Sequence, residues 1–244
     1  MLRLWRVDFA AGDEMKPLKV TAFLRSGFSA AFDWAIAIDS LIASQKCMHE
    51  IGFEQYVENQ STGNTKTHDD LPIAKELWGD EWWYQVSRPF FDCKLVHTKH
   101  LHRRFNIQEF EQHSNSKTSK IETTKGAFKN ARLAKSIFIT PCVTWFVNGD
   151  EEQIRSLLES VTHIGANRGS GHGAVARWQI EPHDNLDDCR FRRIVPNEFA
   201  EQHNIDGITI EWGIRPDYRL PENQFLCVIP ENSEMQHVKA ASSA

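Results

Sequence analysis

The chain has 244 residues, 41% of them hydrophobic, and a formal net charge of −5, which is enough for one large domain or two small ones with a sizeable core. No apolar run approaches the roughly 20 residues of a membrane span. The N-terminal segment has acidic residues where a signal peptide would have its apolar stretch, so we expect a cytoplasmic protein. The five cysteines are widely spaced without a C-x-x-C pair, which argues against a disulfide framework and a thiolate zinc site.

The first part of the chain predicts a strand, a helix and two further strands. Residues 16–25 alternate apolar and polar side chains, as a half-buried strand does. Residues 32–43 are rich in helix formers and predict the first helix. A short helical turn is expected at 73–78, followed by strands at 82–86 and 90–100.

The later part of the chain predicts one long strand and a helix that leads into a second strand. Residues 137–147 give the strongest strand pattern, with Pro141 as a bulge or edge. Ahead of residue 165, apolar residues recur at the i, i+3, i+4, i+7 spacing of one helical face: Ile154, Leu157, Leu158 and Val161. Residues 174–181 then alternate as a strand that ends at Pro182.

Together these elements predict an α+β fold with a ferredoxin-like βαββαβ body. The body would cover residues 16–182 and include a basic insertion at 94–135. Residues 183–230 predict a C-terminal extension with short strands at 191–195, 209–214 and 225–229. We expect this extension to pack on the body because it has few residues able to form a second core. Residues 231–244 predict a disordered tail.

The basic insertion concentrates positive charge in an otherwise acidic chain. Residues 94–135 hold ten Lys or Arg residues and three acids. Such a segment gathers phosphate contacts in one place and predicts RNA binding, whereas the alternative is a solvated charged face. Residues 126–135 could form a helix with a cationic stripe, since Lys125, Lys129 and Arg132 are spaced by four and three. The expected RNA contacts in the insertion are Lys94, Lys99, His100, His102, Arg103, Arg104, Lys125, Lys129 and Arg132.

A glycine-rich loop, residues 165–173 (GANRGSGHG), joins the predicted helix to the strand that follows it. Nucleotide-binding loops run from strand into helix, so this order excludes a nucleotide fingerprint. The glycines would let backbone N–H groups of Gly169, Gly171 and Gly173 face a phosphate, although a mobile turn is the alternative. The expected RNA contacts in the loop are Asn167, Arg168, Gly169, Ser170, Gly171, His172 and Gly173, with Arg25, Ser26 and Arg88 as weaker contacts from neighbouring loops.

The stretch from Thr162 to Trp178 reads T-H-I-G-x-x-R-x-x-G-x-G-x-V-x-x-W. It resembles the C-terminal glycine-rich loop of the CRISPR-associated RAMP superfamily, ferredoxin-like proteins that bind or cut CRISPR RNA. Residues 17–25, 146–150 and 212–230 resemble the Cas-five-like subunit of type IV CRISPR effector complexes. The chain departs from this subunit at Gly27-Phe28, where relatives tend to have proline.

The resemblance implies a non-catalytic RNA-binding subunit of a type IV ribonucleoprotein effector complex in antiviral defence. It would hold the 5′ handle of the CRISPR RNA, cap the complex, and use the basic insertion as a thumb. The implied partners are the CRISPR RNA and the backbone and large subunits, with target nucleic acid contacted only indirectly. The resemblance implies no membrane partner and no cofactor.

Two other functions fit the same residues. In a strand, His100 and His102 would share a face and could act as general base and acid in metal-independent RNA cleavage, as in an endoribonuclease that processes the CRISPR RNA precursor. Such enzymes often place a histidine in the first helix, and residues 32–43 contain none. No third ligand lies nearby and the surrounding charge is positive, so no metal is expected. A third possibility is a structural subunit whose basic segment binds an acidic protein.

Aromatic residues near these segments have two interpretations. Trp82, Trp83, Tyr84 and Trp178 could stack on unpaired bases, as sheet aromatics do in single-stranded RNA recognition. Tryptophan is largely buried on average, so a place in the core is the better interpretation for most of them.

Overall fold

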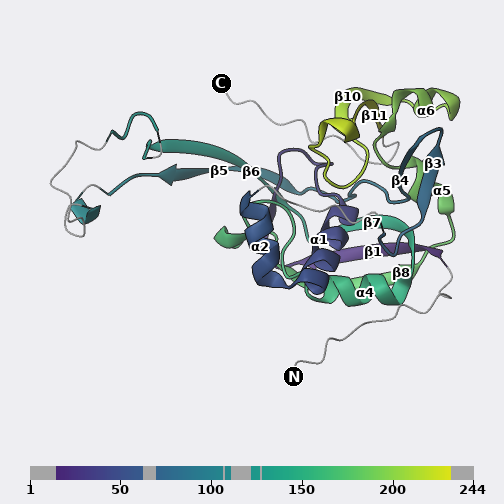
Figure 1. The fold of residues 1–244 in the computed structure, drawn as a ribbon, viewed down its shortest axis with the longest axis horizontal. Helices are drawn as coiled ribbons and strands as arrows, with labels where there is room; N and C mark the ends of the chain where they lie inside the picture. The colour runs from purple at the N-terminus through teal and green to yellow at the C-terminus, as the bar shows by residue number, and fades with distance from the viewer. Residues whose placement is uncertain (1–14, 63–69, 107, 111–121, 127, 232–244) are drawn as a thin grey trace.

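The computed structural model describes residues 15–62, 70–106, 108–110, 122–126 and 128–231. It has a mixed α/β body from which a two-stranded arm projects (Figure 1). The disordered tail predicted for residues 231–244 lies outside the described residues except for Glu231.

The body is built on a three-stranded antiparallel sheet with β1 in the middle. β1 (Lys16–Leu24) pairs with β7 (Cys142–Gly149) on one side and with β8 (Val175–Pro182) on the other. Isolated bridges at Val86 and Phe90 add a further line of chain along the free edge of β7.

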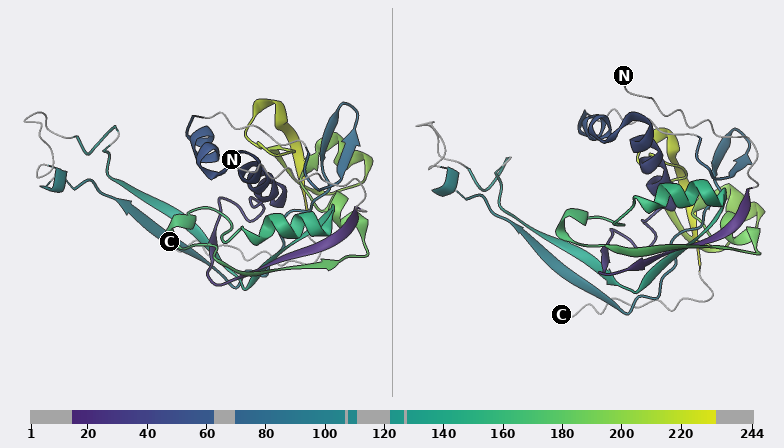
Figure 2. Two further views of the ribbon diagram at one scale, coloured as in Figure 1. Left: turned by 60° about the horizontal axis from the view of Figure 1, so that its bottom comes forward. Right: turned by 90° about the horizontal axis from the view of Figure 1, so that it is seen from below.

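Two helices cover one face of this sheet. α1 (Ile38–Ile51) follows β1, and α4 (Glu151–Glu159) connects β7 to β8. α2 (Phe53–Thr62) extends from α1. Figure 2 shows α1 and α4 on the same side of the sheet. The strand order and the two crossovers are those of a ferredoxin-like α+β fold, which confirms the predicted fold class.

The core lies between the sheet and these helices. Leu18, Val20 and Ala22 of β1 are fully buried, because alternate residues of a strand point to the same face. The predicted apolar stripe of α4 meets them, with Ile154 and Leu158 fully buried. Asp150 caps this helix by accepting a hydrogen bond from the backbone N–H of Gln153 at 2.9 Å.

The arm is a hairpin of β5 (Leu95–Arg103) and β6 (Ala131–Ile139). At its root β2 (Phe28–Ser29) pairs with β6, and the rings of Phe28, Phe91 and Phe138 pack with centroids 5.0–5.6 Å apart. The views in Figures 1 and 2 agree that the arm leaves the body.

Two predictions in this region are wrong. Residues 131–135 of the expected helix 126–135 belong to β6, because their backbone pairs with β5, and a spacing of four and three between cations does not distinguish the two structures. The strand expected at 137–147 is two strands, with a turn at Thr140–Pro141 that lets β7 fold back beside β1. There Leu24 N–H donates to the carbonyl of Pro141 at 2.8 Å.

Earlier segments also differ from prediction. The first helix begins at Ile38 instead of residue 32 and continues to Ile51, so it includes His49, which residues 32–43 do not. Residues 73–78 do not form a helical turn, since β3 (Lys75–Trp78) pairs with β4 (Glu81–Tyr84) as a hairpin. The strand expected at 90–100 is divided, with Phe90 bridged to β7 and β5 beginning at Leu95.

The segment after Pro182 forms a second small sheet with two short helices. β11 (Gln224–Pro230) lies between β10 (Gly207–Gly213) and β9 (Val195–Pro196), and the helices are α5 (Leu186–Phe191) and α6 (Asn197–Gln202). The strand expected at 191–195 is therefore wrong, because most of it lies between α5 and β9. The segment also supplies most of a second hydrophobic cluster around Trp83 of β4, contrary to the expectation that it has few core residues.

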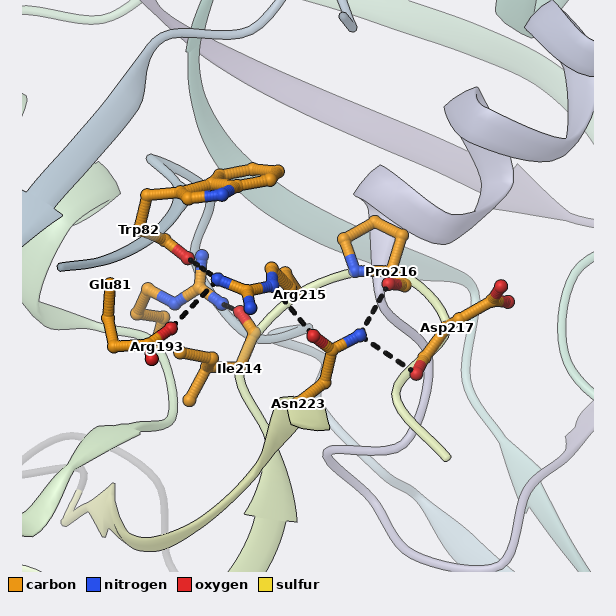
Figure 3. A network of polar contacts seen from close by, with 8 residues as sticks. All are labelled: Glu81, Trp82, Arg193, Ile214, Arg215, Pro216, Asp217 and Asn223. Carbon is orange, nitrogen blue, oxygen red and sulfur yellow. Dashed lines mark hydrogen bonds and ion pairs between the residues drawn. The ribbon is translucent and has the colours of Figure 1, made fainter. Parts of the chain in front are cut away.

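A polar network joins this segment to β4 (Figure 3). Arg215 donates to the carboxylate of Glu81 at 2.9 Å and to the side chain of Asn223 at 2.7 Å. Arg193, only 4% exposed, donates to the carbonyls of Tyr84 and Ile214. The buried carbonyl of Tyr84 thus finds a donor across the junction, which reduces the free-energy cost of burying it.

A second buried contact joins the segment to α1. The hydroxyl of Tyr218 lies 2.7 and 2.9 Å from the two carboxylate oxygens of Asp39, which is fully buried in the first turn of α1. Burial raises the pKa of the Asp39 carboxyl, while the Arg193 guanidinium opposes that shift. The side chain of Tyr218 therefore satisfies a buried acid that belongs to the ferredoxin-like body.

We expect Tyr218→Phe to lower the free energy of unfolding by about 1–3 kcal/mol, because it removes a donor from a buried carboxyl and retains the ring. Urea denaturation monitored by circular dichroism measures the change. The half-exposed Tyr56 of α2 provides the control Tyr56→Phe. Equal unfolding midpoints for the two variants would contradict this role of Tyr218.

Candidate nucleic-acid interface

The glycine-rich loop, residues 165–173, is fastened to residues 26–29, which follow β1. Hydrogen bonds hold the two segments together: Gly173 N–H to Gly27 O at 2.9 Å, Ala166 N–H to Ser29 O at 2.6 Å, and the Ser26 hydroxyl to Gly171 O at 2.9 Å. The Ser26 oxygen also accepts from Ala174 N–H at 3.1 Å. The loop therefore has a defined position at the end of β1.

Two of the loop glycines allow this close approach. Gly165 and Gly173 have φ values of +76° and +72°, a region that L side chains rarely adopt. A Cβ would lie 2.6 Å from the carbonyl oxygen of Ser29 in the first case and 1.9 Å from that of Ile164 in the second. By contrast, a Cβ at Gly169 or Gly171 would meet nothing within 4 Å.

Two backbone N–H groups of the glycine loop have different hydrogen-bond partners from those predicted. Gly171 N–H donates to Arg168 O and Gly173 N–H donates to Gly27 O, both at 2.9 Å. The expectation that these two groups and Gly169 N–H face one phosphate is therefore wrong for two of the three. The reason is that the loop closes on itself through the short 3-10 turn η1 (Arg168–Ser170) and against Gly27. Within the described residues, Gly169 N–H has no hydrogen-bond partner.

The loop side chains fall into two groups. Asn167 has a left-handed backbone with φ of 57°, and its amide donates to the hydroxyl of Ser29 at 3.1 Å, so it holds the loop in place. Arg168 and Ser170 are exposed and His172 is half-exposed. The loop therefore presents a guanidinium, a hydroxyl and an imidazole to solvent.

The arm places like charges directly opposite each other. Lys99 of β5 is the register partner of Lys135 of β6, and His102 is the partner of Arg132. Such cross-strand pairs lie close together and repel when both are charged. Among the described residues, the one ion pair in the arm joins Lys125 to Glu122 at 3.6 Å. Lys135 was not among the predicted contacts, because an expected helix gave no reason to pair it with Lys99.

Most predicted contacts in the arm are accessible. The exposed side chains are those of Lys94, Lys99, His100, His102, Arg104, Lys125, Lys129 and Arg132. Arg103 is the last residue of β5. His100 and His102 are two residues apart in a strand and so share a face, as expected.

The three residues predicted as weaker RNA contacts do not all lie near the glycine loop. The exposed Arg25 lies beside the loop, and its backbone N–H donates to Ala174 O at 2.8 Å. Ser26 contacts the loop directly. Arg88 is elsewhere, with its guanidinium 5.7 Å from the ring centroid of Phe90. Among the described residues, no hydrogen bond or ion pair links Arg88 to the loop.

The aromatic residues considered for base stacking belong mostly to the cores. Trp83 and Tyr84 are fully buried, and the indole N–H of Trp178 donates to Val161 O at 3.0 Å. Trp82 is half-buried, with the ammonium of Lys75 4.1 Å from its ring centroid.

Metal binding, thiolate chemistry and membrane spanning have little support in the part of the chain that the structure describes. No group of three or more His, Cys, Asp or Glu side chains there could hold a metal ion. Burial raises the pKa of the Cys189 and Cys227 thiols to about 12, so neither supplies a thiolate near neutral pH. No helix within the described ranges is long and apolar enough to cross a membrane.

The loop geometry predicts different effects for two glycine substitutions. Gly173→Ala should lower the free energy of unfolding by about 1–3 kcal/mol, because the methyl group meets Ile164 O at a strained φ. Gly169→Ala, with open space around it, is the matched control and should unfold like the wild type. Thermal and urea unfolding compare the two variants. If both unfold alike, the close packing described for Gly173 is incorrect.

Comparison with protein families gives a match over most of the chain. The family described as CRISPR type IV associated protein Csf3 matches residues 16–230, a range that includes the sheet, the arm, the glycine loop and the C-terminal segment. No match to a curated protein was found.

Proposed function

Since the chain belongs to the family of CRISPR type IV associated protein Csf3, we propose that it is the CRISPR RNA-binding subunit of a type IV effector complex. In this proposal it is a Cas-five-like member of the RAMP superfamily that holds the 5′ handle of the RNA and caps one end of the complex. The observation that carries the RNA-binding role is the row of exposed basic side chains on the arm, where Lys99 lies directly opposite Lys135.

The charge pairs on the arm are costly without an anion. Like charges at directly opposite positions of a two-stranded ribbon destabilise it. Phosphates between or beside Lys99 and Lys135 would turn this repulsion into attraction. The arm is therefore better suited to an RNA-bound state than to a free one.

The position of the glycine loop supports a single RNA surface. Residues 26–29 contact the loop through Gly27 and Ser29, and they contact the arm through the pairing of Phe28 with Phe138. RNA lying on Arg168 and Ser170 would thus begin next to the root of the arm. Each arm strand has nine residues, or about 30 Å, so RNA bound at the loop could continue along the arm.

An endoribonuclease remains the second candidate, on the observation that His100 and His102 share an exposed face. A general base is usually oriented by a second hydrogen-bonding group. Among the described contacts, neither imidazole has such a partner. His49, in the last turn of α1, is exposed. We therefore assign the two histidines to RNA binding.

The arm charges should control the salt dependence of RNA binding. For Lys99→Ala/Lys135→Ala we expect weaker binding and a log–log salt slope that is flatter by about 0.7 for each phosphate that the protein no longer neutralises. Fluorescence anisotropy with a CRISPR repeat RNA at several salt concentrations measures this slope.

The matched control is Lys75→Ala/Arg219→Ala, which removes two exposed cations outside the arm and should leave the slope unchanged. A wild-type slope near zero would contradict RNA binding through phosphates. Equal competition by polyglutamate and by RNA would instead favour an acidic protein partner.

The histidine substitutions separate binding from catalysis. Under the proposed function the wild type does not cleave the repeat RNA, and His100→Ala or His102→Ala reduces affinity only modestly. An acid–base nuclease would lose roughly 100-fold or more in rate at either position. Single-turnover cleavage assays beside binding assays decide the matter. Wild-type cleavage at one site, abolished by either substitution with binding retained, would overturn the assignment.

A further inference from the structure

The face of the central sheet opposite α1 and α4 presents cations and aromatic rings. In β1 the residues between the buried Leu18, Val20 and Ala22 point to this face. Lys19 and Arg177 are exposed there, and Phe23 and Phe146 are half-exposed.

The clearest feature on this face is a stacked cation and ring. The guanidinium of Arg177 lies 3.9 Å from the ring centroid of Phe23, its register partner in β1. Arg177 also donates to the side chain of Gln179 at 3.1 Å, and among the described residues no carboxylate pairs with it. A guanidinium stacked on a phenyl ring offers a flat surface, cationic at its edge, of the kind on which nucleobases stack.

A second aromatic position lies further along the face. The ring of Phe146 is 4.5 Å from that of His183 and 5.6 Å from that of Phe90. The guanidinium of Arg192 is 5.8 Å from the Phe146 and Phe90 rings, and it pairs with the Asp188 carboxylate at 2.7 Å.

The charges around these rings are not all neutralised. Glu181 stands opposite Lys19, and Asp188 pairs with Arg192. Arg88 lies near Phe90 with no ion pair among the described residues, and its buried Nε has no hydrogen-bond partner. Burial lowers the pKa of Arg88, while the charge of Asp33 opposes that shift. Arg177, which is exposed and has no ion pair among the described residues, is thus well placed to take a phosphate.

The face continues directly from the glycine loop. The chain passes from Gly173 at the end of the loop to Arg177 in four residues, about 13 Å of strand. On the neighbouring strand, Phe23 precedes Arg25, whose N–H is bonded to Ala174 O at 2.8 Å. An RNA strand that leaves the exposed side of the loop would meet the Phe23–Arg177 stack first.

We propose that this face binds the single-stranded RNA that continues past the glycine loop, with bases stacking at the Phe23–Arg177 pair and at Phe146. The proposal rests on the proposed function, since the same RNA occupies the loop and the arm. Stacking on rings and guanidinium planes tolerates any base, because each base has a π face. The face therefore lengthens the bound segment without reading its sequence.

The test is the dependence of affinity on RNA length. Fluorescence anisotropy at one low salt concentration would compare oligouridylates of about 4 to 20 nucleotides with the wild type, Arg177→Ala and Phe23→Leu/Arg177→Ala. We expect similar affinities for the shortest RNAs, and a loss of about 10-fold in the double variant for the longest ones. Lys75→Ala removes a cation from another aromatic ring and should behave as the wild type.

Arg177→Ala is the variant that should fold normally, because Arg177 is exposed and its replacement leaves the core unchanged. It should show part of the same length-dependent loss. If affinity depends on RNA length identically in the wild type and both variants, the proposal is overturned and the proposed function stands. The same conclusion follows if the variants lose affinity equally at every length. Failure of the wild type to bind RNA of any length would contradict both.

Discussion

Residues 26–29 form the joint on which the position of the candidate interface depends. On one side the carbonyls of Gly27 and Ser29 accept hydrogen bonds from the glycine loop. On the other side the backbone of Phe28 and Ser29 pairs with β6 of the arm. A Cβ at Gly27 would lie 2.6 Å from the side chain of Ile139 and 2.8 Å from the carbonyl oxygen of Phe138, so only glycine permits this approach. The loop and the arm therefore cannot be placed independently.

This joint explains how a chain with an acidic net charge can offer a local surface for RNA. The arm carries its cations on a ribbon that leaves the body, where phosphates can reach them with little repulsion from the acids elsewhere in the chain. The C-terminal segment is fastened to α1 and β4 through Tyr218, Arg193 and Arg215, and Figure 1 shows it gathered near β3 and β4, away from the arm.

The sequence predicted the elements whose patterns are local. β1, β8 and α4 have clear periodicities, and the ferredoxin-like fold follows from their order, although β7 was predicted as one strand with the end of β6. Elements that depend on distant partners were missed. β3 is a strand because it pairs with β4, and Ala131–Lys135 is a strand because it pairs with β5.

The candidate site shows the same division. The exposed cations of the arm and the glycine loop could be identified by residue type and composition. The opposition of Lys99 and Lys135, the use of the Gly171 and Gly173 N–H groups within the chain, and the Phe23–Arg177 stack depend on register and on loop closure. Composition carries no information about strand register or loop closure, so only the structure reveals these features.

If the joint works as proposed, the arm and the glycine loop hold the same RNA. Photo-crosslinking with a single 4-thiouridine moved along a CRISPR repeat RNA, followed by mass spectrometry of the wild-type protein, tests this most directly. We predict that some positions link to peptides of residues 165–173 and that nearby positions of the same RNA link to β5 or β6. Cross-links to only one of these two elements, or to neither, would contradict a shared RNA surface.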